Sequence, residues 1–165
     1  MQNNYFTENM KLADIITANY SLVLMLPRFN ISLGFGEKSV KEICERNGIS
    51  VHFFLLICNV YTFDNYTPNN TKFEEMDFLV PYLSASHYYY MQERLPHIEQ
   101  HLNKIADRID EKYGTILKRF FFFFKDEVAE HFSYEEKTVF PYLNKMEQGI
   151  INEKYTIKEF SATHS

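Results

Sequence analysis

The stretch that decides the fold is residues 130–136, with the sequence Glu-His-Phe-Ser-Tyr-Glu-Glu. It contains His131 and Glu135, which an α-helix places on one face about one turn apart. Apolar residues extend this face in both directions: Ile116, Phe120, Phe124 and Val128 before the pair, Val139 and Tyr142 after it. The pattern predicts that the pair points into a core, where a carboxylate is costly unless a cation neutralises it. A metal ion would do so, whereas a lone His-x-x-x-Glu pair more often lies on an exposed, charged face.

Composition favours an all-α fold. The chain has 165 residues, 45% of them hydrophobic, with only five glycines and five prolines, and β-type alternation is scarce. This length fits one ordinary domain or two small ones. The net charge of −5 argues against a general nucleic-acid-binding surface. The longest apolar runs, residues 21–27 and 120–124, are far shorter than the roughly 20 residues of a membrane-spanning helix.

The two cysteines, Cys44 and Cys58, lie in apolar surroundings and form no Cys-x-x-Cys motif. Disulfide scaffolds of secreted domains carry more cysteines than this. The N-terminus has no basic segment of the kind that opens a signal peptide. We therefore expect two reduced core thiols in a cytoplasmic protein.

The N-terminal part, residues 1–63, is expected to form a small helical domain. Apolar residues recur at helical spacing over residues 11–26, and Pro27 follows as a stop. Residues 29–38, with two glycines, indicate a connecting loop.

Two further helices are expected in this part. Ser39 and Glu42 have the spacing of a capping box. The helix that they begin should end at Asn47-Gly48, and Ser50 can cap the next helix, which runs through Tyr61. Residues 64–75, rich in Asn, Thr and Pro, are the expected linker.

The C-terminal part, residues 76–165, is expected to hold long amphipathic helices. A short helix over residues 73–83, interrupted near Pro81, should precede a helix over 84–113 that Pro96 kinks. The apolar stripe of that helix consists of His87, Met91, Leu95, Ile98, Leu102, Ile105 and Ile109. Gly114 is expected to end this helix. A second long helix should then cover residues 115–146, with Gly149 closing it. Thr156 is expected to cap a last helix.

Three of these helices each place a ligand-type residue on an apolar stripe. The residues are His87, His131 with Glu135, and His164. Inward His and Glu side chains on facing helices form non-haem iron sites in helical bundles. A di-iron centre needs about five to seven protein ligands, and this chain shows four. His97 and His101 lie off the stripe and are expected at the rim or surface.

Four motifs strengthen the metal interpretation: His87-Tyr-Tyr-Tyr, Arg94-Leu-Pro-His-Ile98, His131-Phe-Ser-Tyr-Glu-Glu136 and Phe140-Pro-Tyr142. Together they resemble the hemerythrin-like (HHE cation-binding) family over residues 76–165. The resemblance implies a partial, incomplete four-helix bundle that corresponds to the first half of that domain plus the opening of its third helix. It also implies iron bound by His87, His131, Glu135 and His164, with Glu135 as the bridging carboxylate. The neighbouring acid Glu136 is not carried over as a ligand.

Residues 12–58 are similar to the small helical domain that precedes the hemerythrin-like domain in di-iron proteins that repair iron–sulfur clusters. That domain carries a Cys-Cys-Gly-Gly loop, where this chain has Leu33-Gly-Phe-Gly36. The resemblance implies cluster repair, a response to nitric oxide or oxygen stress, or sensing. Oxygen or nitric oxide would then be the small ligand of the iron.

Two other functions remain open at this point. Residues 39–61 have the spacing of a helix-turn-helix, but no Lys or Arg occurs from Asn47 to Thr71 to bind DNA. A metal-free helical interaction module is the second alternative. An incomplete bundle would leave an apolar stripe in water, so either the natural protein is longer or two chains pair. A homodimer would supply His87, His131 and Glu135 twice.

Overall fold

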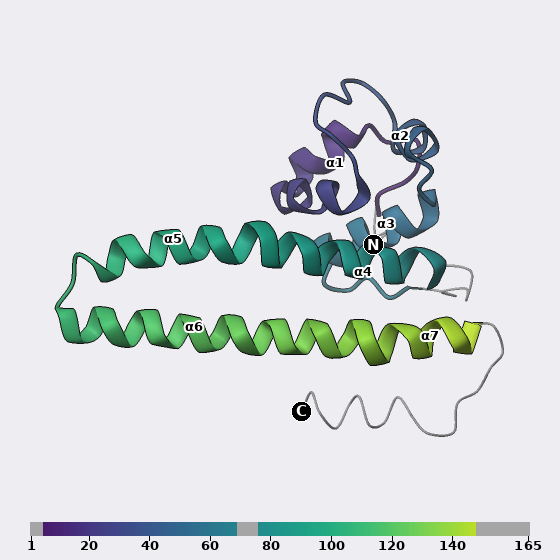
Figure 1. Ribbon diagram of the computed structural model, residues 1–165. Helices are drawn as coiled ribbons and strands as arrows, with labels where there is room; N and C mark the ends of the chain where they lie inside the picture. The colour runs from purple at the N-terminus through teal and green to yellow at the C-terminus, as the bar shows by residue number, and fades with distance from the viewer. Residues whose placement is uncertain (1–4, 69–75, 148–165) are drawn as a thin grey trace. The chain divides into compact units, whose positions relative to one another are not determined.

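The computed structural model describes residues 5–68 and 76–147, and within these ranges the regular structure is helical (Figure 1). The described residues contain no strand, only an isolated bridge between Lys11 and Ser39, so the all-α prediction is confirmed. No helix of the described ranges is long and apolar enough to cross a membrane. The chain divides into two compact units, residues 1–85 and 86–165. The expected linker lies largely outside the described residues and stays a prediction.

The first predicted helix is in fact two segments, α1 (Leu12–Ala18) and the 3₁₀ helix η1 (Tyr20–Phe29). The break is at Asn19, whose backbone is extended. Its side chain accepts a hydrogen bond from the Ser21 amide and donates to the Tyr61 carbonyl at 3.1 Å. Because Asn side chains offer the backbone such alternatives to a helix, the apolar spacing alone gave the wrong boundary. Pro27, the predicted stop, lies inside η1.

The next two helices confirm their predicted caps. In α2 (Val40–Asn47), the Ser39 hydroxyl accepts from the Glu42 amide at 3.3 Å, and the Glu42 carboxylate accepts from the Ser39 amide at 2.8 Å. The helix ends at Gly48, whose φ of 65° favours glycine. Ser50 caps α3 (Val51–Thr62) by accepting from the Phe53 amide at 3.2 Å.

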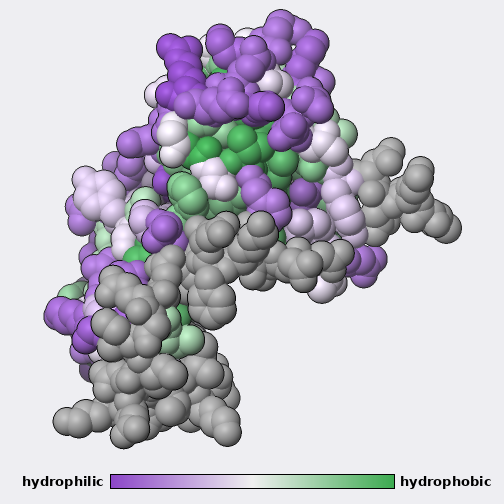
Figure 2. Space-filling model, turned by 90° about the vertical axis from the view of Figure 1, so that its right-hand side faces the viewer, coloured by the Kyte–Doolittle hydropathy of each residue, from purple (hydrophilic) through white to green (hydrophobic). Residues whose placement is uncertain are grey.

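Helix α3 forms the centre of the N-terminal core. Its buried residues are Phe53, Phe54, Leu56, Cys58 and Asn59, and they pack with Leu12, Ile15, Leu22, Leu26, Val40 and Cys44. Polar residues dominate the outer face of this unit, at the top of Figure 2. Burial of so much of α3 counts against its use as a DNA-recognition helix, which needs exposed base-reading side chains.

Both cysteines are buried and form no disulfide, as expected. Burial raises the pKa of Cys44 from 9.0 to about 12, and it raises the pKa of Cys58 well above its ordinary value. Because the thiolate is the reactive form, we expect neither thiol to be alkylated in native protein at mildly alkaline pH. Both should react after unfolding, as measured by mass spectrometry. Rapid alkylation of the native chain would contradict the buried placement.

The same shift gives a direction for stability against pH. The folded state keeps the Cys44 proton to a higher pH than the unfolded state does. Its contribution is therefore fully present below pH 9.0 and is lost as the pH rises towards about 12. The free energy of unfolding should fall over this range, and Cys44→Ala should reduce the fall. An unchanged pH profile in that variant would contradict the assignment.

The C-terminal unit is built on a hairpin of long helices (Figure 1). Helix α4 (Met76–Tyr89) runs without interruption through Pro81 and leads through the π-helical turn η3 (Tyr90–Arg94) into α5 (Leu95–Ala106). Helix α6 (Glu111–Tyr134) runs back beside α5 and continues through a second π-helical turn, η4 (Glu135–Val139), into α7 (Phe140–Glu147). The predicted short last helix, with Thr156 and His164, lies outside the described residues.

The hairpin turn corrects the expected helix boundaries. Helix α5 ends at Ala106 rather than near Tyr113, and α6 begins at Glu111. The Asp110 side chain caps α6 by accepting from the Lys112 amide at 3.0 Å. Gly114, the predicted break, lies inside α6. A Cβ atom there would be 2.4 Å from the carbonyl oxygen of Ala106, so this glycine allows two backbones to approach.

Each π-helical turn is followed closely by a proline. The Leu95 amide bonds to the Tyr90 carbonyl and the Phe140 amide bonds to the Glu135 carbonyl, in each case five residues back. Pro96 and Pro141 then follow directly. A proline cannot make the normal helical hydrogen bond and clashes with the carbonyl four residues earlier, which a wider turn relieves. The predicted irregularity at Pro96 is thus a π turn, and such turns are frequent at functional sites.

Candidate metal centre

His87 occupies an apolar slot in the C-terminal unit. The residue is 6% exposed, near the end of α4. Its ring stacks on Phe132 of α6, with centroids 3.9 Å apart and planes at 11°, and lies near-parallel to Phe140 of α7 at 5.4 Å. The two phenylalanines fix the plane of the imidazole. The two ring nitrogens point to the edges of this slot, where they can contact other side chains.

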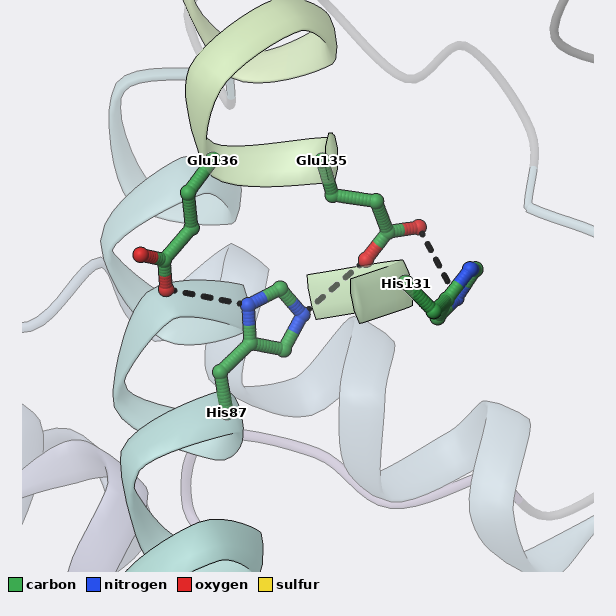
Figure 3. Close-up of polar contacts among 4 residues, drawn as sticks. All are labelled: His87, His131, Glu135 and Glu136. Atoms are coloured by element: carbon green, nitrogen blue, oxygen red, sulfur yellow. Dashed lines mark hydrogen bonds and ion pairs between the residues drawn. The ribbon is translucent and has the colours of Figure 1, made fainter. Parts of the chain in front are cut away.

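Two consecutive carboxylates lie at those edges (Figure 3). The Nε2 atom of His87 is 3.0 Å from Oε2 of Glu135, and its Nδ1 atom is 3.1 Å from Oε1 of Glu136. The other oxygen of Glu135 is 3.5 Å from Nε2 of His131. The four side chains thus form one line of contacts, Glu136–His87–Glu135–His131. Each oxygen of Glu135 faces a different imidazole.

Glu136 is the contact that the sequence analysis missed. An α-helix places it about 100° from Glu135, which would turn it away from His87. The two glutamates lie in η4, however, where the wider π turn brings both within reach of the same ring. Pro141, a few residues further on, is the sequence signal of this irregularity.

The contacts of His87 place a carboxylate oxygen next to each of its ring nitrogens. A neutral imidazole donates from only one of its nitrogens. If Nδ1 donates to Glu136, the lone pair of Nε2 faces a carboxylate oxygen 3.0 Å away. Two acceptors at that distance need a proton or a metal ion between them. A histidine held by a carboxylate on one nitrogen and by a metal on the other is a common arrangement.

The structure therefore brings together three of the four predicted ligands, His87, His131 and Glu135. The fourth, His164, lies outside the described residues. Across residues 5–68 and 76–147, no group of three or more His, Cys, Asp or Glu residues is arranged so that it could hold one metal ion. The donors are instead arranged as two His–carboxylate pairs that share Glu135.

The other two histidines of this region lie on the surface, as predicted. His97 and His101 are both exposed on α5, and their Nε2 atoms are 3.2 Å apart. They follow each other by one helical turn and belong to a separate part of the hairpin from His87. This pair provides an internal control for any experiment on metal binding.

An apolar groove of about 410 Å³ opens beside His131. It is lined by Tyr90, Leu95 and Ile98 on the α5 side and by Phe124, Glu127, Val128, His131 and Phe132 of α6. Nearly all of its lining is apolar. A small uncharged molecule can reach the imidazole of His131 from this side.

Fold and site together define a protein that is helical over the described residues, with a line of histidine–carboxylate contacts that runs from the buried His87 to the half-exposed Glu136 on one side and His131 on the other. No protein-family model, curated protein or solved structure matches the chain. Its function is therefore inferred from the side chains themselves.

Proposed function

We propose that the protein binds non-haem iron as a di-iron centre of the hemerythrin-like type, with His87, His131 and Glu135 as ligands. The observation that carries the proposal is Glu135, whose two carboxylate oxygens each face the Nε2 atom of a different histidine. A carboxylate that bridges two metal ions, each with a terminal imidazole, has this donor pattern. His164 is a further ligand that the family resemblance implies.

The separations of the donors fit this role. Two donors bound to one ion at about 2.1 Å and at right angles lie about 3.0 Å apart. The His87–Glu135 separation is 3.0 Å and the His131–Glu135 separation is 3.5 Å, so small side-chain movements suffice to admit an ion to each pair. Imidazole and carboxylate donors suit iron, whereas structural zinc sites favour cysteine.

The surroundings of His87 support a metal ligand. In the tautomer that donates from Nδ1 to Glu136, the Nε2 lone pair of His87 is directed at Glu135. The rings of Phe132 and Phe140 both lie near-parallel to the imidazole, and His87 is buried. Outer carboxylates of this kind orient histidine ligands and raise their basicity.

Iron bound here would supply coordination positions at which oxygen or nitric oxide can bind. The apolar groove beside His131 gives such small molecules a path to the site. Iron–sulfur cluster repair, a response to nitric oxide or oxygen stress, and sensing are all compatible with this chemistry. Residues 33–36 lack the cysteine pair of the repair proteins, so repair would have to proceed without those thiols.

Elemental analysis of protein purified without oxygen from iron-replete cells tests the proposal. We expect about one iron per chain or more. The double variant His97→Ala/His101→Ala should keep this iron, because its histidines lie outside the proposed site. An iron-free wild-type protein would support the metal-free interaction module instead. Iron that is present in the wild type but lost in the double variant would indicate an ion bound at the surface.

A further inference from the structure

The α5–α6 hairpin has two unlike edges. Ion pairs between Lys118 and Asp107, at 2.7 Å, and between Lys125 and Glu99, at 2.8 Å, close one edge. The opposite edge carries large apolar side chains that are 41–67% exposed. These are Ile98, Ile105 and Ile109 on α5 and the turn after it, and Tyr113, Ile116, Phe120, Phe123 and Phe124 on α6. We refer to these eight residues as the open face.

The open face has the geometry of a second helix-packing surface. Phe121, which is 5% exposed, points towards α5. The α6 residues of the open face are centred about 100° round the helix from Phe121. Neighbours of a helix in a four-helix bundle contact it on two such adjacent faces. The groove beside His131, lined by Ile98 of α5 and Phe124 of α6, shows that both helices contribute to the same face.

The size of the open face exceeds that of scattered surface residues. Half-exposed side chains of this kind together present on the order of 800 Å² of apolar surface. That is about one partner's share of a standard protein–protein interface. Monomeric proteins seldom leave such an area in water, and no element of the described chain covers it.

Charges along α6 indicate what covers it. Lys112 and Arg119 flank the open face in the first half of the helix, and Glu127 and Glu130 flank it in the second half. Two copies of α6 packed antiparallel about a twofold axis would place the basic half of each beside the acidic half of the other. The arrangement is self-complementary, which a different partner would not require.

We propose that the open face is the docking surface for a second copy of this chain, with the two α6 helices antiparallel and the axis level with the middle of the Phe120–Phe124 run. The result is a four-helix bundle made of two hairpins. The docking itself does not depend on bound iron, whereas its consequence for the metal site rests on the proposed function.

In such a dimer the two proposed metal sites lie far apart. With this axis, His131 of one copy lies level with Tyr113 of the other. The two His131 residues are about 27 Å apart along the helices, at 1.5 Å per residue. Each copy therefore holds its own site. This differs from a dimer in which the two chains pool their histidines around one centre.

The mass in solution, measured by light scattering on chelator-treated protein over a range of concentrations, tests the proposal. We expect a dimer for the wild type. Lys112→Glu/Arg119→Glu and Glu127→Lys/Glu130→Lys should each weaken dimerisation by at least about tenfold, because like charges then meet. An equimolar mixture of the two variants should restore a heterodimer.

A wild-type protein that stays monomeric, or that forms larger assemblies, would overturn the proposal. Failure of the mixture to pair would overturn the antiparallel register. Since the protein is iron-free in this experiment, its outcome is independent of the iron content on which the proposed function depends. A dimer without iron, or iron in a monomer, would separate the two proposals.

Discussion

Glu135→Gln is expected to remove most of the bound iron while the helix content stays unchanged. Glutamine keeps the shape of the side chain but loses the charge that both His87 and His131 face. A neutral amide is a poor bridge between two cations, so affinity for iron should fall by more than about a hundredfold, beyond the loss typical of an outer-shell change. His131→Ala should have a similar effect. Iron titration followed by elemental analysis measures both, with circular dichroism as the check on folding.

Two further substitutions that neutralise one carboxylate each test whether the loss of iron depends on the position of that carboxylate. Glu136→Gln keeps the ligands but weakens the hydrogen bond to Nδ1 of His87, so we expect a loss of roughly tenfold to a hundredfold. Asp126→Asn removes the same charge from an exposed position of α6 and should leave iron binding unchanged. If Glu135→Gln and His131→Ala both keep their iron, the central assignment is wrong.

The grouping of His87, His131 and Glu135 could be predicted from the sequence, but the contact to Glu136 could not. His131 and Glu135 were placed on one helix face by their spacing, and the structure brings His87 to them. Glu136 was set aside because regular helical geometry turns it away. That geometry fails in η4, where the backbone bonds five residues back. Local irregularity of this kind depends on the proline that follows and on packing between helices.

Two helix boundaries were wrong for a related reason. Asn19 interrupts an apolar pattern because its side chain bonds to Tyr61, more than forty residues away in the chain. Gly114 was taken as a helix end because glycine has a low helix propensity. It lies inside α6, at a point where the close approach of Ala106 leaves no room for a Cβ atom. In both cases a contact with another helix accounts for what the local preference did not predict.

The open face shows a third limit of sequence patterns. Spacing correctly placed Ile116, Phe120 and Phe124 on one face, and the expectation was that this face enters a core. In the single chain these residues are 56%, 67% and 41% exposed. Periodicity identifies which residues share a face. It does not identify what covers that face, because the covering element can belong to another chain.

Gly114→Ala is expected to destabilise the C-terminal unit by about 2–4 kcal/mol, the range of severe packing conflicts. Helix propensity alone predicts the opposite, a gain of up to about 1 kcal/mol. The packing effect should prevail because the new methyl group would lie 2.4 Å from the Ala106 carbonyl oxygen. That oxygen belongs to the backbone and cannot turn aside as a side chain would. Relief requires α6 to move away from the end of α5.

Urea unfolding followed by circular dichroism measures this change. Thr115→Ala, at the next and exposed position of α6, is the matched control and should change the free energy of unfolding by less than about 0.5 kcal/mol. A Gly114→Ala protein as stable as the wild type would mean that the helices do not approach at this point. The site lies about 26 Å further along α6 at 1.5 Å per residue, so molecules of the variant that remain folded should still bind iron. Loss of stability with retained iron affinity would separate the role of Gly114 in closing the hairpin from the proposed role of Glu135 as a metal ligand.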